Sequence, residues 1–411
     1  MAYRALSHRR PTPRLLNSLV YGALATLLAT LLTTLASCSI WPGDTSTAQK
    51  PTPTPTPKPL VANLIPTTNP FSDLNELIAV APVSATDAWV VGFGKGQVGK
   101  SLGGALIYHW DGTNLKAVPT GLPSAFIDSR LLGVAAVSAN DVWAVGESLQ
   151  ETAAAFGGNK GLIEHWNGAA WQVIPSPGQG GERLHAVAAV SASDVWAVGR
   201  VAQQNPTRNR TLVVHWNGSA WQNIPSPNVG DLSELLAVSA VAPNDVWAVG
   251  KSSQTDGAPS QRLVMHWDGT AWTVVSDPFM TGNGVLQGVK ALSSKDVWVV
   301  GVNNDAPLVA HWDGAAWTEV RGLGPDNVPW AVTAAPDGAV ALVGESASPS
   351  IPLTRWDGTR LQVTTAQSPD LSPGTIVMQG IAALSATEIW AVGFYTPQGG
   401  KEQTIAMRLT S

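Results

Sequence analysis

Histidines and acidic residues recur together along this chain, and imidazole and carboxylate groups can bind metals or transfer protons. Five histidines stand directly before a tryptophan, and each follows an aspartate by 15 to 24 residues. The pairs are Asp87 and His109, Asp141 and His165, Asp194 and His215, Asp245 and His266, and Asp296 and His311. In two further copies, Arg355 and Arg408 replace the histidine, so that a base still stands opposite the acids Asp337 and Glu388. We interpret the whole set as a structural polar network rather than a metal site.

A second pattern, at residues 94–101, matches the phosphate-binding loop of nucleotide-binding proteins. That loop needs a helix after it, because the helix N-terminus helps to hold the phosphates. Here a glycine-rich run leads from Leu102 into Ile107-Tyr108-His109-Trp110, which is typical of a strand. We attribute the match to chance and expect no nucleotide ligand.

Composition excludes several classes of function. The chain holds 24 basic and 29 acidic residues, and residues 1–37 contribute four of the basic and none of the acidic ones. The remaining formal charge of −9 argues against nucleic acid as a partner. The single cysteine rules out a disulfide scaffold and a cysteine-ligated metal site. Because the sequence carries no catalytic triad, paired carboxylates or metal-ligand spacing, we predict no metal or other cofactor, and enzymatic activity is not favoured.

The N-terminus has the order of charge and hydrophobicity that is typical of an export signal. Arg4, Arg9, Arg10 and Arg14 precede an apolar stretch from Leu15 to Ala36. The stretch ends in Leu35-Ala36-Ser37-Cys38, which resembles the signal of bacterial lipoproteins, and Cys38 is the only cysteine. The resemblance implies that residues 1–37 are a signal peptide and that Cys38 is acylated.

An uncleaved transmembrane helix is the alternative to that anchor, since about 20 apolar residues span a bilayer. Either anchor places the rest of the chain at the cell membrane and outside the cytoplasm. Residues 38–59 are rich in proline and threonine, which favour an extended conformation, and we interpret them as a stalk.

Residues 60–411 are built from one repeated pattern. Its clearest copy runs Leu-Ala-Val-Ser-Ala-Val-Ala-Pro-Asn-Asp-Val-Trp-Ala-Val-Gly over residues 236–250 and continues, after a variable loop, to the His-Trp-Asp-Gly of residues 266–269. The glycine that ends the first half occurs at Gly92, Gly146, Gly199, Gly250, Gly301, Gly344 and Gly393. The spacings of 54, 53, 51, 51, 43 and 49 residues are typical of a propeller or a solenoid. Short Val- and Trp-rich runs between turn residues predict four strands per copy, and hence an all-β fold, a seven-bladed β-propeller of four-stranded blades.

The two ends of the repeat region predict how the ring closes. The seventh copy stops at Ser411 after its third strand. Residues 63–69 resemble the fourth-strand ending at residues 223–228, yet they precede the first complete copy. We expect this N-terminal segment to complete the last blade beside residues 403–409, because closure removes exposed sheet edges. The repeated tryptophans are expected to pack between blades.

The layout resembles the β-propeller repeats grouped with kelch and galactose-oxidase central domains, with the BNR-type repeats of photosystem-assembly-factor-like proteins, and with tectonin repeats. The resemblance covers residues 60–411. The kelch Gly-Gly pair is missing from most copies, the BNR Asp-box is incomplete, and the Cys–Tyr crosslink of galactose oxidase would need a cysteine beyond the leader. The resemblance therefore implies the fold alone, because propellers include lectins, scaffolds and enzymes.

The connections between strands differ on the two faces of the predicted ring. The first-to-second and third-to-fourth turns are short and near-uniform, whereas the other connections vary and hold most non-repeating aromatic and basic residues. Recognition is usually built on such free loops. Trp330 breaks the pattern, because its equivalents are Ile78, Leu132, His185, Leu236, Gln287 and Gln379. The predicted ligand or partner face consists of Phe93, Phe156, His185, Arg200, Arg208, Arg210, Lys251, Arg262, Gln287, Trp330 and Tyr395.

The sequence leaves several functions open. We favour a non-enzymatic binding or scaffolding module that is lipid-anchored to the membrane. One alternative is a glycan-binding or glycan-active propeller, which the abundance of tryptophan would serve. Another is an assembly factor for a membrane protein complex. The expected partner is therefore a protein or a glycan at the loop-bearing face.

Overall fold

A computed structural model describes residues 60–98, 101–122, 126–150, 159–204, 207–275, 282–346, 351–366, 371 and 373–411. The predicted signal peptide, Cys38, the stalk and Phe156 lie outside the described residues. The chain divides into two units, residues 1–56 and 57–411, and the described residues all belong to the second. They form 28 β-strands and no helix, which confirms the predicted all-β fold. Accordingly, this part of the chain holds no helix suited to crossing a membrane.

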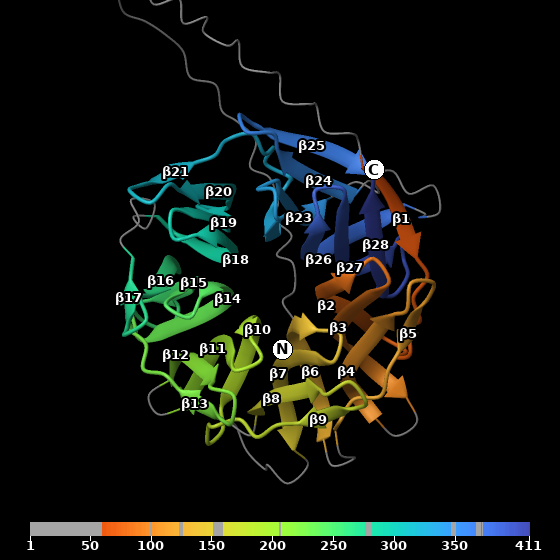
Figure 1. Ribbon diagram of the computed structural model, residues 1–411, viewed down its shortest axis with the longest axis horizontal. Helices are drawn as coiled ribbons and strands as arrows, with labels where there is room; N and C mark the ends of the chain where they lie inside the picture. Colours follow the sequence, from red (N-terminus) through yellow and green to blue (C-terminus); the bar gives the residue numbers. More distant parts are fainter. Residues whose placement is uncertain are drawn as a thin grey trace, which may run out of the picture. The chain divides into compact units, whose positions relative to one another are not determined.

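The strands form seven antiparallel blades of four strands, which follow one another around an axis (Figure 1). Blades 1 to 3 consist of β2 (Leu74–Ser84), β3 (Asp87–Val98), β4 (Ser101–Trp110) and β5 (Leu115–Ala117); β6 (Phe126–Ser138), β7 (Asp141–Gln150), β8 (Asn159–Trp166) and β9 (Trp171–Val173); and β10 (Glu182–Ser191), β11 (Asp194–Gln204), β12 (Thr207–Trp216) and β13 (Trp221–Asn223). Blades 4 and 5 consist of β14 (Leu232–Ala242), β15 (Asp245–Ser253), β16 (Gln261–Trp267) and β17 (Trp272–Val274); and β18 (Gly284–Ser293), β19 (Asp296–Asn303), β20 (Ala306–Trp312) and β21 (Trp317–Glu319). Blades 6 and 7 consist of β22 (Pro329–Ala334), β23 (Val340–Ser346), β24 (Ile351–Trp356) and β25 (Leu361–Ala366); and β26 (Gly374–Ser385), β27 (Glu388–Pro397), β28 (Gln403–Thr410) and β1 (Val61–Ile65).

The ring is closed, as predicted, by the N-terminal strand. β1 pairs antiparallel with β28, with Val61 opposite Thr410 and Ile65 opposite Ala406. Each first strand contacts the first strand of the next blade, and the last of them, β26, contacts β2. The N-terminal strand therefore covers the edge of β28 and joins the two ends of the propeller within blade 7.

A β-bulge in each first strand explains the repeated glycine. In blade 2, Leu131 pairs with Gly146 and Gly133 pairs with Val145, which leaves Leu132 unpaired between them. A Cβ atom on Gly146 would lie 1.8 Å from the carbonyl oxygen of Arg130. The equivalent glycines of the other blades meet the same contact at 1.9 to 2.1 Å. No side chain fits at this position, so glycine ends the first half of every copy.

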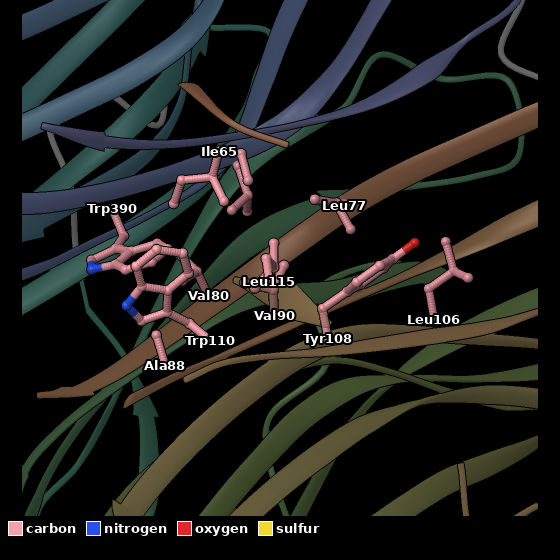
Figure 2. Close-up of a cluster of buried hydrophobic side chains, with 12 residues drawn as sticks. Ile65, Leu77, Val80, Ala88, Val90, Leu106, Tyr108, Trp110, Leu115 and Trp390 are labelled. Atoms are coloured by element: carbon pink, nitrogen blue, oxygen red, sulfur yellow. The ribbon is translucent and has the colours of Figure 1, made fainter. Parts of the chain in front are cut away.

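Tryptophans fill the spaces between blades, as expected. The Trp89 ring of blade 1 lies 4.9 Å from that of Trp166 and 5.2 Å from that of Trp171, both in blade 2. At the seam, Trp390 of blade 7 meets Trp110 of blade 1 at 5.5 Å, within a cluster that includes Ile65 of β1 (Figure 2). Trp89, Trp110, Trp171 and Trp390 are buried, Trp166 is partly exposed, and all five pack between blades and hold the ring together.

Candidate partner-binding face

The described residues of the predicted ligand face lie at the same end of their strands. Each stands level with the repeated glycine of its blade or beyond it, toward the second-to-third and fourth-to-first connections. We call this side of the ring the loop face. His185, Gln287 and Trp330 occupy first-strand bulges next to the axis. The described residues of the set therefore lie on one face of the ring. Binding of a ligand or partner to this face remains a prediction.

Three of these residues are buried and do not form a surface. Phe93 is buried, and the guanidinium carbon of Arg130 lies over its ring, 5.0 Å from the centre of that ring. Tyr395 belongs to an apolar cluster of blades 6 and 7, and Arg262 is 1% exposed. The sequence placed these three residues in loops, and it placed Arg200, Arg208, Arg210 and Lys251 there as well. That expectation is wrong, because β3, β11, β12, β15, β16 and β27 extend past the repeat pattern. In the extended strands, alternate side chains face a neighbouring blade.

The recurrent histidines and aspartates pair within five blades. The Nε2 atom of each histidine lies 2.8 to 2.9 Å from a carboxylate oxygen of its aspartate. Each histidine ring also lies against the second-strand tryptophan of its blade, as His165 does on Trp143 at 4.1 Å. In blade 7, Arg408 donates a hydrogen bond to Glu388 at 2.8 Å. The pairs are separate from one another, and we retain the interpretation that they are structural.

Blade 6 departs from this pattern. Arg355 donates to the backbone oxygen of Ala386 in blade 7, while Asp337 accepts a hydrogen bond from the amide of Ala339. The expectation that Arg355 stands opposite Asp337 is therefore wrong. Asp337 lies in the turn before β23, whereas its equivalents are the first residues of their strands.

Seven side chains mark the bulges around the axis, and we call them the axial collar. Each is the unpaired residue between two paired residues of its first strand. In blade order they are Ile78, Leu132, His185, Leu236, Gln287, Trp330 and Gln379. The sequence positions that were compared with Trp330 are therefore neighbours around one axis.

A buried carboxylate gathers bases from blades 3 and 4. Glu234, on β14, has His185 Nε2 2.7 Å and Arg200 Nε 3.0 Å from its Oε1 atom, and Lys251 Nζ 3.4 Å from Oε2. Burial opposes ionisation, but the hydrogen bond and charge of His185 and the charges of Lys251 and Arg200 lower the pKa of Glu234 to about 2. Glu234 is thus ionised at neutral pH and fixes three partly exposed bases at the loop face.

A second cluster links blades 2 and 3. Glu147 is 4% exposed and accepts hydrogen bonds from Arg183 and, at 2.7 Å, from Asn159. Arg130 Nη1 lies 3.8 Å from the same carboxylate. Burial acts to raise the pKa of Glu147, but the hydrogen bond and charge of Arg183 and the charge of Arg130 hold it below its usual value.

The two clusters form one charged arc over blades 2 to 4. We use this name for Arg130, Glu147, Arg183, His185, Arg200, Glu234 and Lys251. Its four lysine and arginine side chains face the carboxylates of Glu147 and Glu234. A third carboxylate, Asp128, lies 3.8 Å from Arg130 Nε, so the net excess is one positive charge when His185 is neutral. The equivalent cross-strand pairs of blades 5 and 7 are Val285 with Val302 and Val377 with Phe394. The loop face is therefore charged on one side of the axis and largely apolar at the same level on the other.

A groove of about 450 Å³ lies along blade 3, beside the segment that enters it from blade 2. It is lined by the loop of residues 177–180 and by Glu182, Val201, Thr211 and Pro225. Glu182 and Val201 directly neighbour Arg183 and Arg200 in sequence. The Glu182 carboxylate is buried and accepts hydrogen bonds from Ser176 and from the amide of Gly161.

The remaining basic residues of the predicted set have local partners. Arg208 Nε lies 3.3 Å from an oxygen of Asp231, and Arg210 donates to the backbone oxygen of Gly230. Residues 94–98 continue β3 and Ser101 begins β4, so a hairpin stands where a phosphate-binding loop needs a helix. Within the described ranges, no group of three or more His, Cys, Asp or Glu side chains is arranged to hold a metal ion.

Sequence reasoning missed four of the seven residues of the charged arc. Arg130, Glu147, Arg183 and Glu234 were not among the predicted residues, although His185, Arg200 and Lys251 were. A signal was present, because charged residues interrupt the first strands of blades 1 to 4 at a position where blades 5 and 7 have valine. Which of them meet across blades depends on the ring itself.

Comparisons with known proteins show the fold and no family. No protein-family profile and no curated protein matches the chain by sequence. Among solved structures, the chain is similar to YCF48 bound to D1 peptide, with 15% identity and a TM-score of 0.53 over 86% of this chain and 95% of that one. It is also similar to U3-55K, with 14% identity and a TM-score of 0.55 over 85% of this chain and 98% of that one. YCF48 from Cyanidioschyzon merolae matches at 12% identity with a TM-score of 0.53, over 85% of this chain and 99% of that one.

Proposed function

We propose that this propeller is a non-enzymatic binding or scaffolding module whose charged arc receives an acidic segment of a partner protein. The observation that carries the proposal is the set of partly exposed bases, Arg200 and Lys251 among them, fixed by buried carboxylates. The whole chain has a net charge of −5, so this positive arc is a local feature. Such a feature favours a specific acidic partner over general binding of polyanions.

The geometry of the face supports a segment rather than a small molecule. The groove along blade 3 is lined by Glu182 and Val201, which lie one residue along β10 and β11 from Arg183 and Arg200. An extended chain can lie across the groove and the charged arc, with acidic side chains at the arc and its backbone over the loop of residues 177–180. YCF48, which has the same fold, was solved with a bound peptide. A propeller of this kind can therefore bind a peptide.

We propose further that acylated Cys38 holds the propeller at the outer side of the cell membrane, on the stalk of residues 38–59. The leader pattern supports this location. Replacing Cys38 by alanine should release the protein from membranes or leave an unprocessed precursor. Unchanged retention of a chain that keeps its leader would favour the transmembrane alternative.

Quantitative capture from native membranes tests the partner site. We expect Lys251→Ala with Arg200→Ala to reduce capture of the partner about tenfold or more, and we expect capture by the intact protein to weaken with salt. Lys295→Ala is the matched control, because Lys295 is exposed in a turn on the opposite face. Equal loss in both variants, or loss in Lys295→Ala alone, would contradict the proposed face.

A further inference from the structure

Trp330 is the tryptophan that the packing of the ring does not use. The described residues include 17 tryptophans, and 16 of them belong to the apolar clusters between blades. Trp330 belongs to none of these described clusters and makes none of the ring contacts found among the described aromatic residues. It is partly exposed and stands in the axial collar, on the bulge of β22. A large aromatic side chain placed beside the axis without a packing role points to a ligand.

Amide side chains flank Trp330 around the collar. Gln287 precedes it on β18 and Gln379 follows it on β26, and both strands contact β22. The backbones adjoin closely, since a Cβ on Gly288 would lie 3.3 Å from the carbonyl oxygen of Trp330. The Gln379 amide nitrogen donates to Glu76 at 2.9 Å, which fixes that side chain. The side chain of Gln287 makes no hydrogen bond to another described residue and can therefore bond to a ligand.

Lys290 adds a positive charge to the same sector. Its equivalents in the other first strands are Ala81, Ala135, Ala188, Ser239, Thr333 and Ala382. It shares a face of the sheet with Trp298, which packs against β22, so Lys290 lies on the side toward the strand of Trp330. It forms no ion pair within the described part of the chain, and desolvation lowers its pKa. Along the strand, Lys290 lies about 10 Å from Gln287, within the length of two sugar units.

We propose that the sector of Gln287, Trp330, Gln379 and Lys290 is a binding site for a saccharide that carries an acidic group. The indole ring offers an apolar face to the C–H groups of a pyranose ring, and the amides offer donors and acceptors to its hydroxyls. The ammonium group of Lys290 pairs with a carboxylate on the sugar. Neutral amides around an aromatic ring suit a polyol, whereas the charged arc across the axis suits an acidic protein segment. The sector lies on blades 5 to 7 and is independent of the proposed partner site.

Calorimetric titration of the full-length chain in detergent tests the site. The probes are trigalacturonate with its neutral methyl ester, and sialyllactose with lactose. We expect an acidic probe to bind at least fivefold more tightly than its neutral counterpart. Trp330→Ala should lower affinity at least tenfold, Trp330→Phe should retain part of it, and Gln287→Ala should weaken it. Gln172→Ala, on an exposed outer strand, is the matched control and should have no effect.

Two further comparisons test the role of Lys290 and the independence of the two proposed sites. Lys290→Met should abolish the preference for the acidic probe while neutral binding remains. The preference surviving in Lys290→Met, or a folded wild-type chain that binds neither acidic probe, would overturn the proposal. Lys251→Ala should leave saccharide affinity unchanged and Trp330→Ala should leave partner capture unchanged, so the failure of one site is distinguishable from failure of the other. Thermal melting of each variant shows that it is folded.

Discussion

Some repeat positions carry one residue that departs from the others, and Glu164 is the clearest case. Its side chain is fully buried between blades 1 and 2, at a position where other blades have Tyr108, Val214 or Met265. One carboxyl oxygen accepts a hydrogen bond from the amide of Gly121 at 2.7 Å, while the other has no partner among the described residues. Burial outweighs this hydrogen bond and raises the pKa of Glu164 to about 7.

Glu164 should make the protein less stable as pH rises. The folded state keeps a proton that the unfolded state loses near pH 4.5, the ordinary pKa of a glutamate, so stability is full below that pH and falls until about pH 7. The shift corresponds to roughly 3 to 4 kcal/mol. Glu164→Gln should therefore raise the melting temperature at pH 8 by a few degrees and change it little at pH 4.

Melting curves across this pH range check that prediction. Glu345→Gln is the control, because Glu345 is exposed, and it should follow the wild type. Some pH dependence should remain in Glu164→Gln, since desolvation also raises the pKa of Glu76 to about 7. Parallel pH curves for Glu164→Gln and the wild type would show that Glu164 is not the titrating group.

At the scale of the element, the bulged first strand is the unit that the repeat encodes. The bulge turns one side chain per blade toward the axis and forces the opposite residue to be glycine. The same device therefore shapes the core of each blade and presents the axial collar. Collar residues can differ between blades, because the blade structure depends on the backbone bulge and not on the side chain at that position.

Gly146→Ala should destabilise the protein strongly. Its Cβ would lie 1.8 Å from the Arg130 carbonyl oxygen, and a backbone atom cannot move aside without breaking the bulge. We expect a loss of at least about 2 kcal/mol in the free energy of unfolding by urea. Gly324→Ala is the matched substitution, because its nearest neighbour is a side-chain atom at 3.5 Å, and it should change stability by less than about 0.5 kcal/mol. Similar losses in both variants would show that the close approach is not the cause.

At the scale of the whole molecule, closure by β1 determines whether the ring is one cooperative structure. Ile65 of β1 is 8% exposed and packs with Trp110 and Trp390 across the seam, whereas Val61 of the same strand is 61% exposed. Losing this strand would expose the edge of β28, which is a site for aggregation.

Paired substitutions in β1 test the seam. Ile65→Asp places an unpaired charge in the cluster and should cost about 3 kcal/mol or more, with aggregation on partial unfolding. Val61→Asp should cost less than about 0.5 kcal/mol. Urea unfolding and size-exclusion chromatography measure both effects. A stable and monomeric Ile65→Asp variant would mean that β1 is not needed to close the ring.

The sequence by itself determined the blades, their number and the closing strand. These depend on local patterns, namely the repeated glycine, the Asp-Gly turns and the strand endings, and each copy repeats them. It also indicated which face carries the variable residues, because strand order fixes the side on which each connection lies. It failed in blade 6, where a different turn moves Asp337 away from Arg355, and at Arg262, where a strand runs further than the repeat pattern.

Only the tertiary structure decided which charged residues meet. Arg183 reaches Glu147 in one neighbouring blade, and His185 reaches Glu234 in the other, although about 36 and 49 residues separate the partners in sequence. The role that we propose for Trp330 likewise depends on the ring, in which this residue lies outside every described core cluster and beside Gln287. Contacts between blades depend on how far each strand turns around the axis, and no local pattern in the sequence records that geometry.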